Sequence, residues 1–327
     1  MTSPYGFSMM PLENRRDVLV RLAVEAERAG HAAFYLPETW AYDTSVLLGE
    51  VAARTERIEL GTGVLGVWNR SAATIAMAAS TLDAISGGRF ALGLGASTAQ
   101  LVEGLHDVRY AAPVERMRRV LTQVRALLRG ERVPLDPQAG ARPLRLNLPP
   151  APRVPIYLAG LAPETVRLAG ELADGWMPFL YPRSRLREGM TLLREGRARA
   201  TEVRDLPRIV PSLPAVIAAD AGEARKGAAW FVAFYLTSMG PFYPRIISRL
   251  GFEREVQAVI AANTTRGSAV VPPEAEVLLD ELTVYGTPDD ARDRLSRWQE
   301  AGAELPILLL PPQLEPAQID FALSSLA

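Results

Sequence analysis

The sequence predicts a single (β/α)8 barrel, the TIM-barrel class of α/β fold, over residues 1–327. Strand-like apolar runs alternate with helical patterns almost from end to end, and most connections between them are short. The runs are continuously apolar, as parallel strands covered on both faces are. Eight such units in one chain favour a closed barrel with right-handed crossovers. An open doubly wound sheet usually has a nucleotide-binding fingerprint early in the chain, and none is found there.

Eight apolar runs supply the predicted strands. Tyr5–Pro11 is the weakest, whereas AAFYLP at Ala32–Pro37 and LPILLL at Leu305–Leu310 are typical of buried strands. The strands between them are Ile58–Val64, Phe90–Leu94, Val154–Leu158, Trp176–Leu180 and Ile209–Ala218.

The predicted helices follow from apolar periodicity and end signals. In the first helix Val18 and Leu22 lie four residues apart, and Gly30 stands where a C-cap belongs. In the last helix Thr287 is the expected N-cap, with Pro288 at the first helical position. The helices are Glu13–Gly30, Asp43–Arg54, Ala72–Ile85, Pro113–Leu128, Pro163–Ala173, Arg183–Thr201, Ala221–Leu236 and Thr287–Ala301.

Two stretches depart from the alternation and are interpreted as insertions. The first, at about 130–152, is rich in proline and polar residues and is compatible with a hairpin. The second, at about 240–284, precedes the last repeat and combines helical pieces with a loop near Pro272 and Pro273.

Composition excludes several classes of protein. With 36 basic and 37 acidic residues, the net charge of -1 does not indicate a nucleic-acid partner. Arginines such as Arg116, Arg118, Arg119 and Arg125 are interpreted as a solvated helix face. The absence of cysteine excludes disulfides and thiolate chemistry. No signal peptide is recognisable and no apolar run is long enough for a membrane span, so we expect a cytoplasmic protein without a membrane partner.

Active sites of α/β barrels lie at the carboxyl ends of the strands, where the sequence offers four candidate segments. After the second strand, Glu38, Thr39 and Trp40 combine a carboxylate, a hydroxyl and an indole, suited to a proton donor, an orienting group and a stacking wall. The alternative is that Glu38 pairs with an arginine. At the end of the third strand, the glycines of Gly61–Val64 indicate either a bulge against which a planar ring stacks or a tight barrel turn.

The other two segments are glycine turns. Gly93–Thr98 (GLGAST) resembles a dinucleotide fingerprint, but Thr98 takes the place of its third glycine, and the segment lies deep in the chain. Its backbone N–H groups and hydroxyls still suit a ligand. Ala159–Pro163 (AGLAP) leads into a helix, and a helix N-terminus attracts anions such as phosphate. Alternatively, Glu164 satisfies this helix end itself.

The chain has only two histidines, so no metal triad of histidines is present. His31 precedes the second strand, where a structural role is expected. His106 follows the fourth strand's glycine loop, where it is a candidate acid, base or pocket residue. No nucleophile elbow and no Walker loop occurs, which argues against hydrolase and nucleoside triphosphatase functions.

Three segments resemble the luciferase-like flavin- and F420-dependent oxidoreductases: Arg57–Ser97, which contains TLDAISGGRFALGLG, Val154–Trp176, and Tyr285–Gly302. The resemblance implies a non-prolyl cis peptide at Gly63-Val64 that supports the cofactor ring. It also implies that the strand-four loop lines the cofactor's side chain and that the AGLAP loop holds its phosphate. The cofactor-binding candidates are Thr62, Gly63, Val64, Gly95, Ala96, Ser97, Ala159, Gly160, Leu161, Ala162 and Pro163.

Within this superfamily the sequence leans towards the F420-dependent branch related to methylenetetrahydromethanopterin reductase. Relatives there often carry an acid–histidine pair after strand two, whereas this chain has Glu38-Thr39-Trp40. Some F420-dependent dehydrogenases place a glutamate where Thr98 stands, which argues against a sugar-phosphate dehydrogenase. The likeness further predicts a homodimer.

Three functions remain open at this point. The first is an F420-dependent oxidoreductase that moves a hydride between deazaflavin C5 and a small organic substrate, with Glu38 as proton donor. The second is a monooxygenase that uses reduced FMN and O2, and the third is a barrel that has lost redox chemistry. The predicted substrate pocket contains Trp68, Thr98 and His106, with Trp40 as a further wall. The apolar stretch Trp230–Met239 and the pair Phe242–Tyr243 belong to that pocket, to the core or to a dimer contact.

Overall fold

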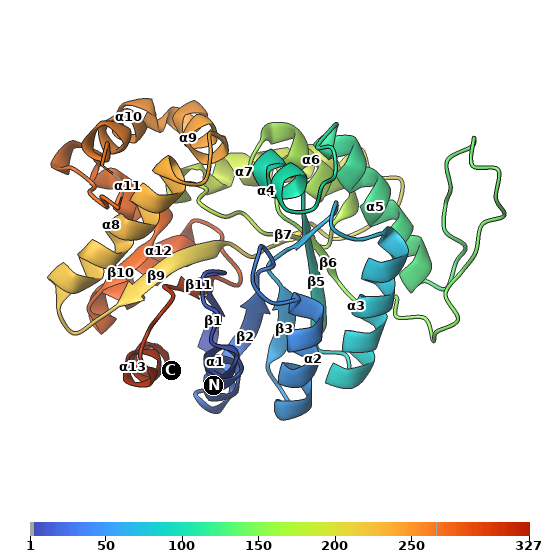
Figure 1. Ribbon diagram of the computed structural model, residues 1–327, viewed down its shortest axis with the longest axis horizontal. Coiled ribbons are helices and arrows are strands. Elements are labelled where there is room, and N and C mark those ends of the chain that lie inside the picture. Colours follow the sequence, from blue (N-terminus) through green and yellow to red (C-terminus); the bar gives the residue numbers. More distant parts are fainter. Residues whose placement is uncertain (1–2, 266) are drawn as a thin grey trace. The chain divides into compact units, whose positions relative to one another are not determined.

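The computed structural model describes residues 3–265 and 267–327 (Figure 1). Contacts divide the chain into two compact units. The organisation as a single domain stays a prediction. Unit 1 consists of Met1–Ala32, Pro178–Thr191 and Ile209–Ala327, and unit 2 consists of Ala33–Met177 and Leu192–Arg208.

Unit 1 contains four strands that pair in parallel in the order β10-β9-β11-β1. These are β1 (Ser3–Met9), β9 (Ser212–Ile217), β10 (Val284–Gly286) and β11 (Ile307–Leu310). Its helices include the predicted α1 (Arg16–Arg28), α8 (Ala221–Thr237) and α12 (Pro288–Glu300), and α12 begins with the predicted Thr287 cap. The remaining helices are η1 (Arg183–Arg185), α9 (Phe242–Ile247), η2 (Ser248–Phe252), α10 (Glu253–Ala262), η3 (Pro273–Ala275), α11 (Val277–Leu282) and α13 (Pro316–Ser325).

Unit 2 contains the parallel order β2-β3-β5-β6-β7, with β4 paired to β5. The strands are β2 (His31–Leu36), β3 (Glu59–Thr62), β4 (Leu65–Gly66), β5 (Phe90–Gly95), β6 (Ile156–Leu158) and β7 (Gly175–Trp176). The helices are α2 (Thr44–Arg54), α3 (Ala72–Ser86), α4 (Ala99–Gly104), α5 (Pro113–Leu128) and α6 (Pro163–Leu172). The chain passes between the units within β2, between Met177 and Pro178, within α7 (Leu186–Arg197) and within β8 (Arg208–Ile209).

Several strand predictions need correction. The predicted strand Ile209–Ala218 is divided into β8 and β9, and β10 was not predicted. The third strand is interrupted at residues 63–64 and continues as β4, whose Leu65 and Gly66 pair with Leu94 and Gly95 of β5. The sixth strand ends at Trp176 instead of Leu180, because Leu180 takes a left-handed backbone conformation with φ 55°. A bulky residue rarely adopts that conformation and cannot extend a strand with it.

The two predicted insertions differ in character. Between residues 129 and 153, all of them described, no strand forms; the segment is a long loop beside α5 (Figure 1), in which Val133 N–H donates to the Leu144 carbonyl at 2.8 Å. The second insertion is helical, as expected, and its helices share a buried core with α8. That core includes Phe231, Val256 and Leu279.

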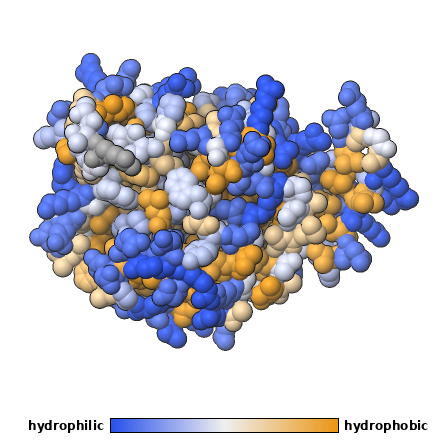
Figure 2. All heavy atoms as spheres, in the orientation of Figure 1, coloured by the Kyte–Doolittle hydropathy of each residue, from blue (hydrophilic) through white to orange (hydrophobic). Residues whose placement is uncertain are grey.

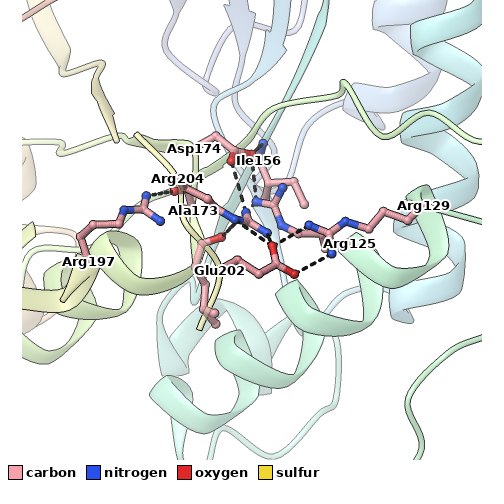
Figure 3. A network of polar contacts seen from close by, with 9 residues as sticks. Arg125, Arg129, Ile156, Ala173, Asp174, Arg197, Glu202 and Arg204 are labelled. Atoms are coloured by element: carbon pink, nitrogen blue, oxygen red, sulfur yellow. Dashed lines mark hydrogen bonds and ion pairs between the residues drawn. The ribbon is translucent and has the colours of Figure 1, made fainter. Parts of the chain in front are cut away.

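A polar network in unit 2 is centred on Asp174, which directly precedes β7 (Figure 3). Its Oδ2 accepts from the Ile156 N–H and from Arg125, both at 2.8 Å, and its Oδ1 lies 3.4 Å from Arg204. Glu202 in turn binds Arg204 and Arg129. The interpretation of Arg125 as part of a solvated face is therefore wrong: its side chain is 14% exposed and ties α5 to the starts of β6 and β7.

Hydrophilic residues cover much of the face drawn in Figure 2, and hydrophobic residues form smaller patches between them. Within residues 3–265 and 267–327, no helix combines the length and apolar character needed to cross a membrane.

In unit 1, a buried carboxylate links the loop after β1 to the loop after β11. Glu13 is 1% exposed and accepts from the Arg15 backbone at 2.8 Å, from the Arg15 guanidinium at 2.7 and 2.9 Å, and from the Gln313 N–H at 2.9 Å. Arg15 also donates to the Leu314 carbonyl at 2.8 Å. Burial alone would raise the pKa of Glu13, but these hydrogen bonds outweigh it and lower the pKa to about 2.

We expect Glu13→Gln to lower the free energy of unfolding at pH 7 by about 3 kcal/mol, because buried donors lose a charged acceptor. Since the folded pKa lies below the ordinary value of 4.5, this contribution is present above pH 4.5 and is lost as the pH falls towards about 2. Urea unfolding of both proteins between pH 7 and pH 3 measures it. Asp320→Asn, in an exposed pair with Arg21, is the control and should change stability by less than about 1 kcal/mol. A wild-type-to-variant difference that does not shrink at low pH would contradict the assignment.

Candidate functional site

The interruption of the third strand is a bulge that contains a cis peptide bond between Gly63 and Val64, as predicted. The bulge is bonded to the chain that leaves β2. Gly63 N–H donates to the Leu36 carbonyl at 2.9 Å, and Glu38 N–H donates to the Val64 carbonyl at 3.4 Å. The bulge therefore belongs to the carboxyl ends of both β2 and β3.

The glycines of β5 let this bulge lie close to the neighbouring strand. A Cβ on Gly93 would lie 2.0 Å from the Thr62 carbonyl oxygen, and one on Gly95 would lie 2.7 Å from Cγ2 of Val64 and 3.4 Å from Cβ of Ala159. Larger residues at these positions would displace the bulge. The predicted residues Val64, Gly95 and Ala159 thus meet at one place.

Thr62 is one of the predicted cofactor-binding residues, and its side chain contacts Gly93 of β5. Its side chain is fully buried, and its hydroxyl both donates to the Gly93 carbonyl and accepts from the Gly93 N–H at 2.8 Å. The hydroxyl therefore joins β3 to β5 beneath the bulge.

The loop after β5 is open to solvent. Ala96 is half-buried, whereas Ser97 is exposed and has φ 60°. The Thr98 hydroxyl caps α4 by accepting from Leu101 N–H at 3.5 Å. The sequence did not predict α4, because a six-residue helix is too short to show apolar periodicity.

The helix α6 begins at the AGLAP loop without a side-chain cap at Ala162, and Pro163 is its first residue. Glu164 pairs with Arg167 at 2.9 Å, so the alternative in which it satisfies the helix end is not what the structure shows. Trp176 holds the turn by donating from Nε1 to the Gly160 carbonyl at 2.8 Å. This arrangement leaves the positive end of the helix dipole available to an anion.

Glu38 forms an ion pair, the alternative to a proton donor. Its Oε1 accepts from Arg70, and its Oε2 accepts from Thr44 N–H at 3.1 Å. Arg70 also binds Asp43 at 2.6 Å, and Asp43 caps α2. Both carboxylate oxygens of Glu38 act as acceptors, so in this structure Glu38 holds the loop after β2.

Three polar atoms from the loops after β2 and β4 are buried and lack a hydrogen-bond partner within the described part of the chain. They are Thr39 Oγ1, Trp68 Nε1 and Asn69 Oδ1. Buried polar atoms are normally paired, so these atoms are candidates for contact with a ligand. The Trp68 ring packs near Tyr110, whereas Trp40 is 43% exposed.

Of the two histidines, His31 has the structural role that the sequence predicts. His31 is buried in unit 1, where Nε2 lies 2.9 Å from the Leu323 carbonyl oxygen and burial lowers the pKa of the ring. His106 is half-buried in the loop after α4, and its place in a substrate pocket stays a prediction.

Sequence reasoning missed Arg70 and Met177. Arg70 is a single arginine in a polar loop, without a sequence motif around it. Its role becomes visible only in its contacts with Glu38 and Asp43 of the loop after β2. Met177 lies against Gly63 and Gly93: its Sδ would be 3.0 Å from a Cβ on Gly93. It lies within the predicted strand Trp176–Leu180, where an apolar residue is also expected for packing alone.

A model of the luciferase-like monooxygenase family matches residues 2–305. A Mycobacterium tuberculosis protein that bears the name coenzyme F420-dependent oxidoreductase is 31% identical over 312 residues, covering 88% of this chain and 89% of its own. The F420-dependent tetrahydromethanopterin reductase of Methanopyrus kandleri has a similar structure, with a TM-score of 0.78 and 19% sequence identity. The similarity covers 99% of this chain and 98% of that one. The FMN-bound oxygenating constituent of 3,6-diketocamphane monooxygenase from Pseudomonas putida also has a similar structure, with a TM-score of 0.75 and 18% sequence identity. The similarity covers 99% of this chain and 97% of that one.

These findings define the protein as an oxidoreductase with the α/β-barrel fold that the sequence predicts. The chain belongs to the luciferase-like monooxygenase family, and the relatives to which it is similar include proteins named for F420.

The residues present fit a cofactor with a planar ring and a phosphate. The bulge at Gly63-Val64 offers a backbone surface, Gly95 leaves space beside Val64, and the start of α6 suits a phosphate. The unpaired atoms of Thr39 and Trp68 add a donor and a hydroxyl at the same strand ends.

We expect Arg70→Ala to free Glu38 and loosen the loop after β2. Hydrogen exchange at the Thr44 amide, which donates to Glu38, should become about tenfold faster, equivalent to about 1.4 kcal/mol. Amide exchange followed by NMR measures this. Arg54→Ala, which removes an exposed pair at the other end of α2, should leave Thr44 unchanged. Equal exchange in wild type and Arg70→Ala would show that Glu38 keeps its place without the arginine.

Proposed function

We propose that the protein is an F420-dependent oxidoreductase that transfers a hydride between deazaflavin C5 and a small organic substrate. The observation that carries the proposal is the bulge at Gly63-Val64 packed against glycines of β5, in a chain whose Mycobacterium tuberculosis relative is named for F420. The similarity to the tetrahydromethanopterin reductase fold supports it.

In this proposal the cofactor ring rests on the bulge, with Gly95, Ala96 and Ser97 beside its side chain. The phosphate lies at the AGLAP turn, where the N-terminus of α6 stabilises negative charge. When bound, the cofactor supplies hydride chemistry, and the protein supplies position and electrostatics. Thr39 and Trp68 offer hydrogen bonds from the loops, and the Glu38–Arg70 pair keeps the first of these loops in place.

This assignment changes the role proposed for Glu38. A proton donor would need to be protonated and free, whereas the carboxylate is held by Arg70 and Thr44. We therefore assign Glu38 to positioning. Thr98 and His106 keep their proposed place beside the substrate.

An FMN-dependent monooxygenase is the second candidate, because the diketocamphane monooxygenase constituent of the same fold was solved with FMN. The uptake of oxygen during turnover would distinguish it, since deazaflavin hydride transfer consumes no O2. A barrel without redox function is the third candidate, motivated by the absence of a histidine after β2. A cytoplasmic location and a homodimer stay predictions, and light scattering tests the latter.

Titration of the purified protein with F420 and with FMN, followed by tryptophan fluorescence, tests the proposal. We expect tight binding of F420 and weak binding of FMN. The reverse order would favour the monooxygenase, and binding of neither would favour the protein without redox function.

Gly95→Ala should weaken F420 binding by about tenfold, because a methyl group 2.7 Å from Val64 Cγ2 displaces the bulge. The matched control is Gly104→Ala in α4, where a Cβ meets nothing within 4 Å and the affinity should not change. Thermal unfolding of both variants separates a local effect from a loss of fold. An unchanged affinity for Gly95→Ala would remove the bulge from the cofactor site.

A further inference from the structure

Arg116 of α5 lies over an aromatic ring of the loop after β4. Its Cζ is 5.2 Å from the centroid of the Trp68 indole, and its Nε donates to the Val67 carbonyl at 3.0 Å. The Trp68 ring also packs against Tyr110, with 5.5 Å between the ring centroids. A cation–π contact and a backbone hydrogen bond therefore hold the guanidinium in place. The interpretation of Arg116 as part of a solvated face needs the same correction as that of Arg125.

These contacts connect Arg116 to the bulge at Gly63-Val64. Val67 directly follows β4, and its N–H donates to the Gly95 carbonyl at 3.0 Å. A Cβ on Gly95 would in turn lie 2.7 Å from Cγ2 of Val64. All of these residues belong to unit 2. The guanidinium is thus fixed beside the carboxyl ends of β4 and β5, and barrel enzymes bind their substrates at such ends.

The positive charge of Arg116 has no counter-ion among the described residues. The three other arginines of α5 each pair with a carboxylate, as Arg118–Glu171, Arg119–Asp136 and Arg125–Asp174. Burial and repulsion from Arg119 both lower the pKa of Arg116, and no carboxylate opposes them. Since a guanidinium nevertheless stays protonated in proteins, Arg116 is a fixed and uncompensated cation.

Both residues of this contact have donors that the described part of the chain does not use. Trp68 Nε1 is buried without a hydrogen-bond partner, although a buried indole N–H usually has one. Arg116 donates to the described residues through Nε alone, which leaves its two terminal nitrogens for another acceptor. Packing would explain a cation over an indole, but it does not account for the unused donors.

We propose that Arg116 binds the carboxylate of an acidic organic substrate, with Trp68 as the platform that fixes the guanidinium. A carboxylate matches the terminal nitrogens of a guanidinium in both geometry and charge. Arg116 is half-buried, so a ligand can reach it from solvent. The proposal rests on the proposed function and goes beyond it by assigning the substrate class and a specificity-determining residue. The alternative that the test must exclude is a contact that only packs Trp68.

The experiment compares benzoate with benzamide, which has the same ring and a planar group of similar size but no charge. Binding of each compound is measured by ligand-observed NMR titration on the full chain, first alone and then saturated with F420. We expect the wild type to prefer benzoate about tenfold at low salt, the value of a charged hydrogen bond. Arg116→Gln should abolish this preference and leave benzamide binding unchanged. Added salt should weaken benzoate binding to the wild type but not to Arg116→Gln, because it screens the charge pair.

Arg118→Gln is the matched control, because it removes the same charge from the same helix, and it should keep the preference. Near-wild-type thermal unfolding of both variants excludes a loss of fold. A wild type without preference for benzoate, or a preference that survives in Arg116→Gln, would overturn the proposal.

The source of the carboxylate is tested by the F420 affinity of the same variants. We expect Arg116→Gln to bind F420 as the wild type does. Weaker F420 binding with unchanged benzoate binding would assign Arg116 to an acidic group of the cofactor and overturn the proposal. Failure of the wild type to bind F420 would overturn the proposed function alone, since the titration of the cofactor-free chain measures Arg116 independently.

Discussion

The approach of β5 to the end of β3 allows no side chain at position 93, where a Cβ would lie 2.0 Å from the Thr62 carbonyl oxygen. The Thr62 hydroxyl fills the remaining space with two hydrogen bonds to Gly93. With the strands fixed at this distance, the chain leaves the ladder at residues 63–64 and rejoins it as β4. The bulge, the packing of Val64 over Gly95 and the nearness of Ala159 all follow from that one steric constraint.

Buried charges then fix the loops that surround the strands. Glu13 joins two loops of unit 1 through Arg15 and Gln313, and in unit 2 Glu38 and Arg70 join the loops after β2 and β4. Each carboxylate receives both a guanidinium and a backbone N–H, which compensates the loss of solvation on burial. The loops at the strand ends are thus held by few, strong contacts, while the sheet itself is held by apolar packing.

Local signals in the sequence were sufficient for most of the fold. Apolar runs predicted β2 and β11, the cap at Thr287 predicted the start of α12, and paired glycines marked the bulge and the loop after β5. The cis bond came from the family resemblance. Contacts between distant residues could not be predicted: Gln313 donates to Glu13 across 300 positions, and the choice of Arg70 as partner for Glu38 depends on folding. The end of β7 was missed because the apolar run continues to Leu180 while the backbone turns.

The residues around the bulge all come from one uninterrupted stretch, Ala33–Met177, whereas α8 and the helices of the second insertion belong to unit 1. Mutation or exchange of the insertion can therefore proceed without touching the segment that carries the glycine-rich strand ends. In such an architecture, the helical insertion can vary in length and sequence while the strand ends around the bulge stay the same.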